Sequence, residues 1–123
     1  MYIIIIRILL KIYSFTAAHC IQLKSSHSIP KSDILAYVGR FNIRNWTEEH
    51  TQPREIGEIF IHPDYNPETL YSDIAVLKLS TVVVISQYVN PVCIWPGEEN
   101  LSSVVGRQGV VSTDSSNQTF IFI

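Results

Sequence analysis

Residues 72–79 read SDIAVLKL, which places Asp73 at the head of a mostly apolar segment, residues 74–79. An apolar run of this length, entered from a turn, is typical of a strand buried on the wall of a barrel. Short β-rich stretches alternate with polar turns on both sides of it, and no helical period is sustained. The sequence therefore predicts an all-β fold.

Further strands are expected at residues 34–38 (ILAYV), 55–62 and 92–95. Glycine or proline bounds each of them, as is usual where a strand ends in a turn. The intervening segments, residues 24–33 and 42–53, are polar and are expected to be loops. No internal repeat and no low-complexity linker interrupts this pattern.

Residues 1–14 form an apolar segment without an assigned role. Its apolar block, residues 2–6, is broken by basic residues and is shorter than the roughly 20 apolar residues that span a bilayer. We therefore expect no membrane span. Three interpretations stay open: a signal peptide cleaved near the small residues 16–18, a β-branched strand over residues 8–15, or a segment foreign to the domain.

Length and charge narrow the classes of function. The chain has 123 residues, which fits one small domain or half of a larger one. It is 46% hydrophobic and 16% charged, a composition that excludes a wholly disordered chain. Nine basic against eleven acidic residues give a net charge of −2, without the basic excess that phosphate binding requires, so we expect no nucleic-acid partner.

The cysteines and the glycosylation sequons bear on the compartment. Cys20 and Cys93 are the only cysteines, and they lack the close spacing of a zinc or redox motif. Asn45, Asn100 and Asn117 each begin an N-x-S/T acceptor site. Such sites suit a secreted chain.

Two local patterns carry residues suited to acid–base chemistry: residues 16–20 read TAAHC, and Asp73 begins the apolar segment already described. A histidine that acts as a general base needs a carboxylate to fix its tautomer and stabilise its cation. Taken singly, His19 and Asp73 are more often structural residues. Together they are candidates for a base and its orienting carboxylate.

TAAHC resembles the histidine motif of the chymotrypsin-like (trypsin family) serine proteases, and SDIAVLKL resembles their aspartate motif. Residues 36–40 (AYVGR), 61–66 (IHPDYN) and 90–96 (NPVCIWP) resemble structural segments of that family in type and order. The resemblance covers residues 15–111, a partial peptidase domain. It implies the first six-stranded antiparallel β-barrel of a two-barrel fold, with the second barrel absent and residues 112–123 unmatched.

By this resemblance His19 is the general base and Asp73 its orienting carboxylate. The family's serine nucleophile lies in a G-D-S-G-G motif that these residues do not contain. Asp114-Ser115-Ser116 is the nearest imitation, but it lacks the glycines that shape an oxyanion hole. We therefore expect a fragment of a secreted serine endopeptidase that is inactive as written, whose full-length parent acts on a protein substrate or regulatory protein.

Two other interpretations remain. One is a non-catalytic protease homologue that binds partners as a secreted interaction protein. The other is a small secreted binding protein that begins at His19.

The resemblance also bears on disulfides and metals. In the family the counterparts of Cys20 and Cys93 pair with cysteines that this sequence lacks, so we expect free thiols not bonded to each other. Some members bind calcium through a glutamate at the position of Arg40; a cation there disfavours calcium. The histidines and cysteines show no zinc spacing, so no metal and no cofactor are expected.

Overall fold

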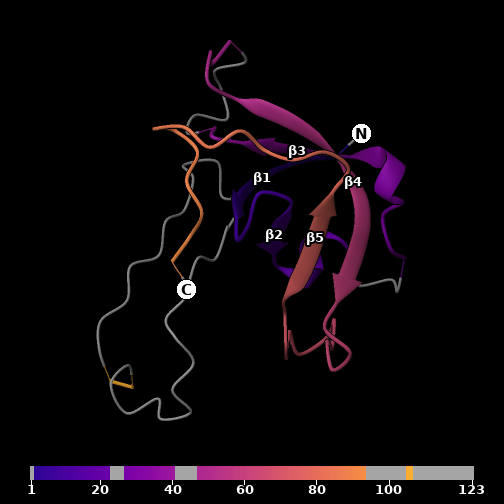
Figure 1. The fold of residues 1–123 in the computed structure, drawn as a ribbon. Helices are drawn as coiled ribbons and strands as arrows, with labels where there is room; N and C mark the ends of the chain where they lie inside the picture. Colours follow the sequence, from indigo (N-terminus) through magenta and orange to yellow (C-terminus); the bar gives the residue numbers. More distant parts are fainter. Residues whose placement is uncertain (1, 23–26, 41–46, 94–104, 107–123) are drawn as a thin grey trace. The chain divides into compact units, whose positions relative to one another are not determined.

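The computed structural model describes residues 2–22, 27–40, 47–93 and 105–106, and of residues 3–7 it describes the backbone only. The chain divides into two units, Met1–Val92 and Cys93–Ile123. The first unit contains every strand described (Figure 1).

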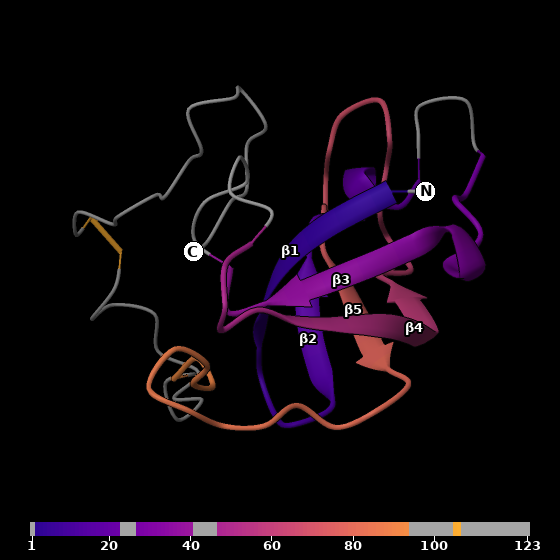
Figure 2. The ribbon, with the colours of Figure 1, turned by 90° about the horizontal axis from the view of Figure 1, so that it is seen from above.

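Five strands form the first unit: β1 (Tyr2–Ile8), β2 (Tyr13–Thr16), β3 (Ile34–Val38), β4 (Gln52–Ile61) and β5 (Ala75–Leu79). Two short 3-10 turns accompany them, η1 (Ala18–Cys20) and η2 (Lys31–Asp33). The strands close into a barrel in the order β1-β2-β5-β4-β3, and Figure 2 shows the curled sheet from above. The expected all-β barrel is confirmed.

β5 shows how the sequence builds the barrel wall. Ala75, Leu77 and Leu79 are buried and alternate with partly exposed Val76 and Lys78, so one face of the strand lines the core. The neighbouring strands β2 and β4 both pair with it in antiparallel register. The core lies inside the barrel and is mostly aliphatic: Ile8, Ala18, Ile21, Ile29, Ile34, Ala36, Val38, Ile56, Ala75, Leu77, Leu79, Val83 and Val89.

The strand count differs from expectation, because the described residues hold five strands where six were expected. Four of the pairings are antiparallel, and β1 pairs with β3 in parallel. A closed ring in which every neighbour is antiparallel needs an even number of strands. A ring of five must therefore contain a parallel seam, and here the seam joins Tyr2–Ile8 to Ile34–Val38.

The apolar start of the chain forms part of this barrel. The alternative of one strand over residues 8–15 is wrong, because the chain turns at residues 9–12 between β1 and β2. The Leu9 N–H donates to the Tyr13 carbonyl over 2.8 Å and closes that turn. In the described part of the chain, no helix has the length and apolar character needed to cross a membrane.

Two glycines explain local irregularities that the sequence only suggests. The imperfect alternation around residues 55–62 comes from a β-bulge at Gly57, where the β4–β5 register shifts between Ile56 and Glu58. Gly39 ends β3 with φ +76°, and a Cβ there would lie 2.5 Å from Cγ2 of Val89. Only glycine fits both this backbone conformation and this close approach.

The remaining expected strand, residues 92–95, lies partly outside the described residues. Val92 and Cys93 are described and are not part of a strand.

Candidate active site

His19 is held by the turn η1, which follows directly after β2. Ala17 is extended, with φ −73° and ψ 139°, and the Cys20 N–H donates to its carbonyl over 3.1 Å. Ala18 is completely buried, so it anchors the turn to the core. The small residues before the histidine therefore let the chain turn tightly against the barrel, with the His19 side chain 38% exposed at its surface.

Asp73 is held between a loop and β5. The Ile74 N–H donates to the Ser72 carbonyl over 2.8 Å, which makes Asp73 the centre of a tight three-residue turn. Ile74 then accepts a hydrogen bond from the His62 N–H over 3.0 Å, at the end of the β4–β5 ladder. The Asp73 side chain is only 13% exposed.

The structure brings these two predicted residues together. Oδ2 of Asp73 lies 2.6 Å from Nδ1 of the His19 ring, and Oδ1 accepts the His19 backbone N–H over 2.8 Å. Both oxygens of one carboxylate thus contact one residue, which fixes its backbone and its ring at the same time. An ionised carboxylate only accepts hydrogen bonds, so Nδ1 carries the proton and Nε2 is left as an acceptor when the ring is neutral.

The charge of Asp73 also contributes to the pKa shifts of two neighbouring groups, the Cys20 thiol and the Tyr65 hydroxyl. Burial raises the pKa of the Cys20 thiol, a hydrogen bond with Thr16 opposes this, and the negative charge of Asp73 adds to the rise. Burial likewise raises the pKa of the Tyr65 hydroxyl, with further contributions from Asp73 and Cys20. A thiol shifted in this direction stays protonated near neutral pH, so Cys20 is a poor nucleophile.

Other candidates from the sequence have less to contribute. Cys20 and Cys93 are free cysteines, the first half-buried and the second exposed. Arg40 is buried, and its guanidinium carbon lies 5.1 Å from the centre of the Tyr37 ring. Within the described ranges, no three His, Cys, Asp or Glu side chains gather as metal ligands would. The Asp114-Ser115-Ser116 segment and the asparagines of the sequons lie outside the described residues.

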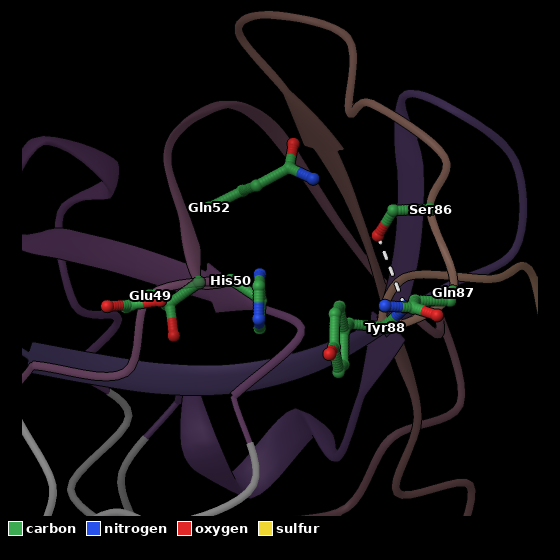
Figure 3. A pocket seen from close by; sticks show the side chains of 7 residues that line it. Glu49, His50, Gln52, Ser86, Gln87 and Tyr88 are labelled. Carbon is green, nitrogen blue, oxygen red and sulfur yellow. Dashed lines mark hydrogen bonds between the residues drawn. The ribbon is translucent and has the colours of Figure 1, made fainter.

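One feature that the sequence does not indicate is a surface pocket of about 380 Å³, formed by residues 49–52 and 86–88 (Figure 3). The His50 and Tyr88 rings are stacked there, with centroids 3.7 Å apart and planes 7° from parallel. The Gln52 side chain accepts the Val84 N–H and donates to the Val84 carbonyl. The two segments are distant in the sequence, so no local pattern could have indicated the pocket.

Comparison with known proteins agrees with the barrel and its motifs. A family model described as Trypsin matches residues 11–118. The chain is 33% identical over 109 residues to the protein named Serine protease gd of Drosophila melanogaster, covering 85% of this chain and 20% of that one. It is 39% identical over 85 residues to the Venom peptide isomerase heavy chain of Agelenopsis aperta, covering 69% of this chain and 33% of the relative.

A third relative carries a different description. The chain is 38% identical over 89 residues to the Inactive serine protease PAMR1 of Xenopus tropicalis, covering 71% of this chain and 12% of the relative. The chain thus spans a third or less of the length of these curated relatives. The family match extends over most of the chain and includes both motifs. The protein belongs to the trypsin family, of which it represents the N-terminal part of a chymotrypsin-like serine protease domain.

Proposed function

We propose that this chain supplies the general base and the orienting carboxylate of a secreted trypsin-like serine endopeptidase. The observation that carries the proposal is the double contact of the Asp73 carboxylate with His19, at 2.6 Å to the ring and 2.8 Å to the backbone N–H. This arrangement leaves Nε2 as the acceptor that a base needs. The side chain of His19 is exposed enough to meet a reacting group.

In this mechanism Nε2 of His19 takes the proton of a serine hydroxyl as the hydroxyl attacks the carbonyl of a peptide bond. Asp73 holds the ring in the required tautomer and stabilises the cation that forms. The serine and the oxyanion hole come from residues outside these 123, in the part of the domain that follows the first barrel. Without such a hydroxyl the base has no nucleophile to deprotonate, so we expect the 123 residues alone not to hydrolyse peptides.

Secretion is proposed from the glycosylation sequons together with the family. Relatives include a protein named as a venom serine protease, from Bombus ignitus, and one named as a clotting factor, from Tachypleus tridentatus. The substrate class that follows is protein. We propose no nucleic-acid partner, because the net charge is −2. We propose no membrane partner, because the apolar block of residues 2–6 is far shorter than the roughly 20 residues that span a bilayer.

One observation favours a second candidate, a non-catalytic homologue that binds proteins through the barrel surface. The similarity to the relative named as an inactive serine protease, at 38% identity, supports this candidate. The contact between His19 and Asp73 supports the catalytic proposal, because it provides the ring tautomer that a general base requires. A product beginning at His19 is disfavoured, since it would lack β1 and β2 and the barrel could not close.

The test begins with the transcript, read through the codons for residues 15 and 111. We expect a continuous frame that encodes a G-D-S-G-G motif downstream. The protein encoded by that frame is then expressed and assayed on peptides with Arg, Lys, Phe or Ala before the scissile bond. A glycine in place of the serine of that motif would favour the non-catalytic homologue.

Variants of the same protein test the roles of the two residues. We expect Asp73→Asn to lower kcat about ten-thousand-fold, since the amide favours the wrong tautomer, and His19→Ala to lower it at least as far. Asp64→Asn removes an exposed carboxylate from the turn after β4 and serves as the matched control. Equal activity of Asp73→Asn and Asp64→Asn would refute the proposal.

A further inference from the structure

The loop before Asp73 is closed almost entirely by one residue, Asn66. Its side-chain Oδ1 accepts the backbone N–H groups of Glu68 and Thr69, over 2.9 and 3.1 Å. Its own N–H donates to the Tyr71 carbonyl over 3.0 Å, and its carbonyl accepts the Leu70 N–H over 2.8 Å. Four hydrogen bonds therefore fold residues 66–71 back on themselves.

The loop closed in this way contains backbone that the chain would not adopt freely. Leu70 has φ 57° and Ser72 has φ 53°, and both are left-handed residues with a side chain. Such conformations are unfavourable for residues other than glycine and persist only where surrounding contacts impose them. Asn66 contacts Leu70 directly through one bond, that of its backbone carbonyl with the Leu70 N–H. Its side chain holds the turn at Glu68 and Thr69, which leads into Leu70 and then Ser72.

The direction of the Asp73 carboxylate depends on the backbone conformation at Ser72. On its C-terminal side the backbone is fixed, because Ile74 is bonded to His62 and Ala75 is paired with Ile61. On its N-terminal side the left-handed conformation of Ser72 sets the direction in which the backbone enters Asp73. If Ser72 relaxed to a right-handed conformation, the Cα–Cβ bond of Asp73 would rotate relative to the barrel.

We propose that Asn66 is a positioning residue for the His19–Asp73 pair. By closing the loop it holds Ser72 in its left-handed conformation and aims the carboxylate of Asp73 at Nδ1 of His19. Asn66 is exposed, and the contacts described for it are with the loop itself, so it acts through Asp73 and not on the ring directly. The inference rests on the proposed function only in treating the pair as catalytic.

The tautomer of His19 is the readout, because it reports the contact with Asp73 and requires no hydrolysis. Long-range ¹H–¹⁵N NMR of the full-length protein, at a pH where the ring is neutral, gives the fraction of His19 protonated at Nδ1. Asp73→Asn sets the lower reference, since a neutral imidazole without a carboxylate partner is not held in the Nδ1–H form. Far-UV circular dichroism establishes that each variant is folded.

We expect Asn66→Ala to lose more than half of the difference in Nδ1–H fraction between the wild type and Asp73→Asn. Asn66→Asp keeps an acceptor for the same two N–H groups and should restore the wild-type value. Glu68→Ala is the matched control: it changes an exposed side chain in the same loop, and it keeps the backbone N–H that Asn66 binds. If Asn66→Ala does not fold, Asn66→Ser takes its place, with a weaker acceptor and a smaller expected loss.

An unchanged Nδ1–H fraction in the folded Ala or Ser variant would overturn the inference. So would a loss that Asn66→Asp does not restore, or an equal loss in Glu68→Ala. The proposed function can fail separately, if the full-length protein shows no hydrolysis although the tautomer depends on Asp73 and Asn66. If the wild type and Asp73→Asn had the same Nδ1–H fraction, Asp73 would not control the His19 tautomer. That result would overturn both the proposed function and the role of Asn66.

Discussion

Gly39→Ala should destabilise the barrel strongly, because two separate effects coincide at this position. The φ of +76° lies in the left-handed region, which is unfavourable for alanine by about 1–2 kcal/mol. The new Cβ would also lie 2.5 Å from Cγ2 of Val89 and 3.1 Å from the His50 carbonyl oxygen, and such overpacking costs about 1–3 kcal/mol. The lower chain entropy of unfolded alanine offsets about 0.4–1 kcal/mol.

The expected net loss is therefore about 3 kcal/mol in the free energy of unfolding. For a domain of about 60–100 residues this lowers Tm by roughly 12–24 °C. Thermal and urea unfolding of the chain, followed by circular dichroism, measure it. Gly106→Ala is the matched control, because Gly106 also has a positive φ, +80°, but no atom lies within 4 Å of its added Cβ, and it belongs to the second unit.

A double-mutant cycle separates the clash from the backbone effect. Val89→Ala alone should cost about 2 kcal/mol, because Val89 is only 2% exposed and its methyl groups fill the core. The double variant lacks the methyl group that the new Cβ at position 39 would meet, so its loss should be smaller than the sum by about 1–3 kcal/mol. Additive losses, or a Gly39→Ala variant as stable as the wild type, would refute the close approach.

Three other predictions concern thiol reactivity, pH dependence and association. Cys20 should react with iodoacetamide more slowly than Cys93 near neutral pH, because burial raises the pKa of its thiol whereas Cys93 is exposed; equal rates by mass spectrometry would contradict this. The hydrogen bond and charge of Lys78 lower the pKa of Glu58, so the stabilisation from this pair is fully present above the ordinary carboxyl pKa of 4.5 and is lost as pH falls through the lowered pKa. Glu58→Gln should therefore make the free energy of unfolding fall less steeply with decreasing pH. An unchanged steepness would exclude the pair as its cause. The chain should self-associate at micromolar concentration, because apolar side chains of the loop before β5 are exposed, Tyr71 by 70%; a single 14.0 kDa species on sedimentation would contradict this.

Local chemistry in the sequence was enough to predict the all-β class, the strand over residues 34–38 and the buried wall strand that follows Asp73. Alternation of apolar residues and the turn residues at strand ends depend only on near neighbours, so they can be read without knowing the fold. The candidacy of His19 and Asp73 also came from their own motifs. What the motifs could not supply is the 2.6 Å contact between them, because it joins elements that are distant in the sequence.

The tertiary structure alone decided how the barrel closes. Residues 2–8 have no local feature that identifies a strand partner, yet they pair with both β2 and β3 and make the parallel seam that a ring of five strands requires. The pocket beside the stacked His50 and Tyr88 rings likewise depends on long-range contacts, because it joins residues 49–52 to residues 86–88. Such contacts form only when the loops between the strands are closed, and no pattern of neighbouring residues encodes which edges will then meet.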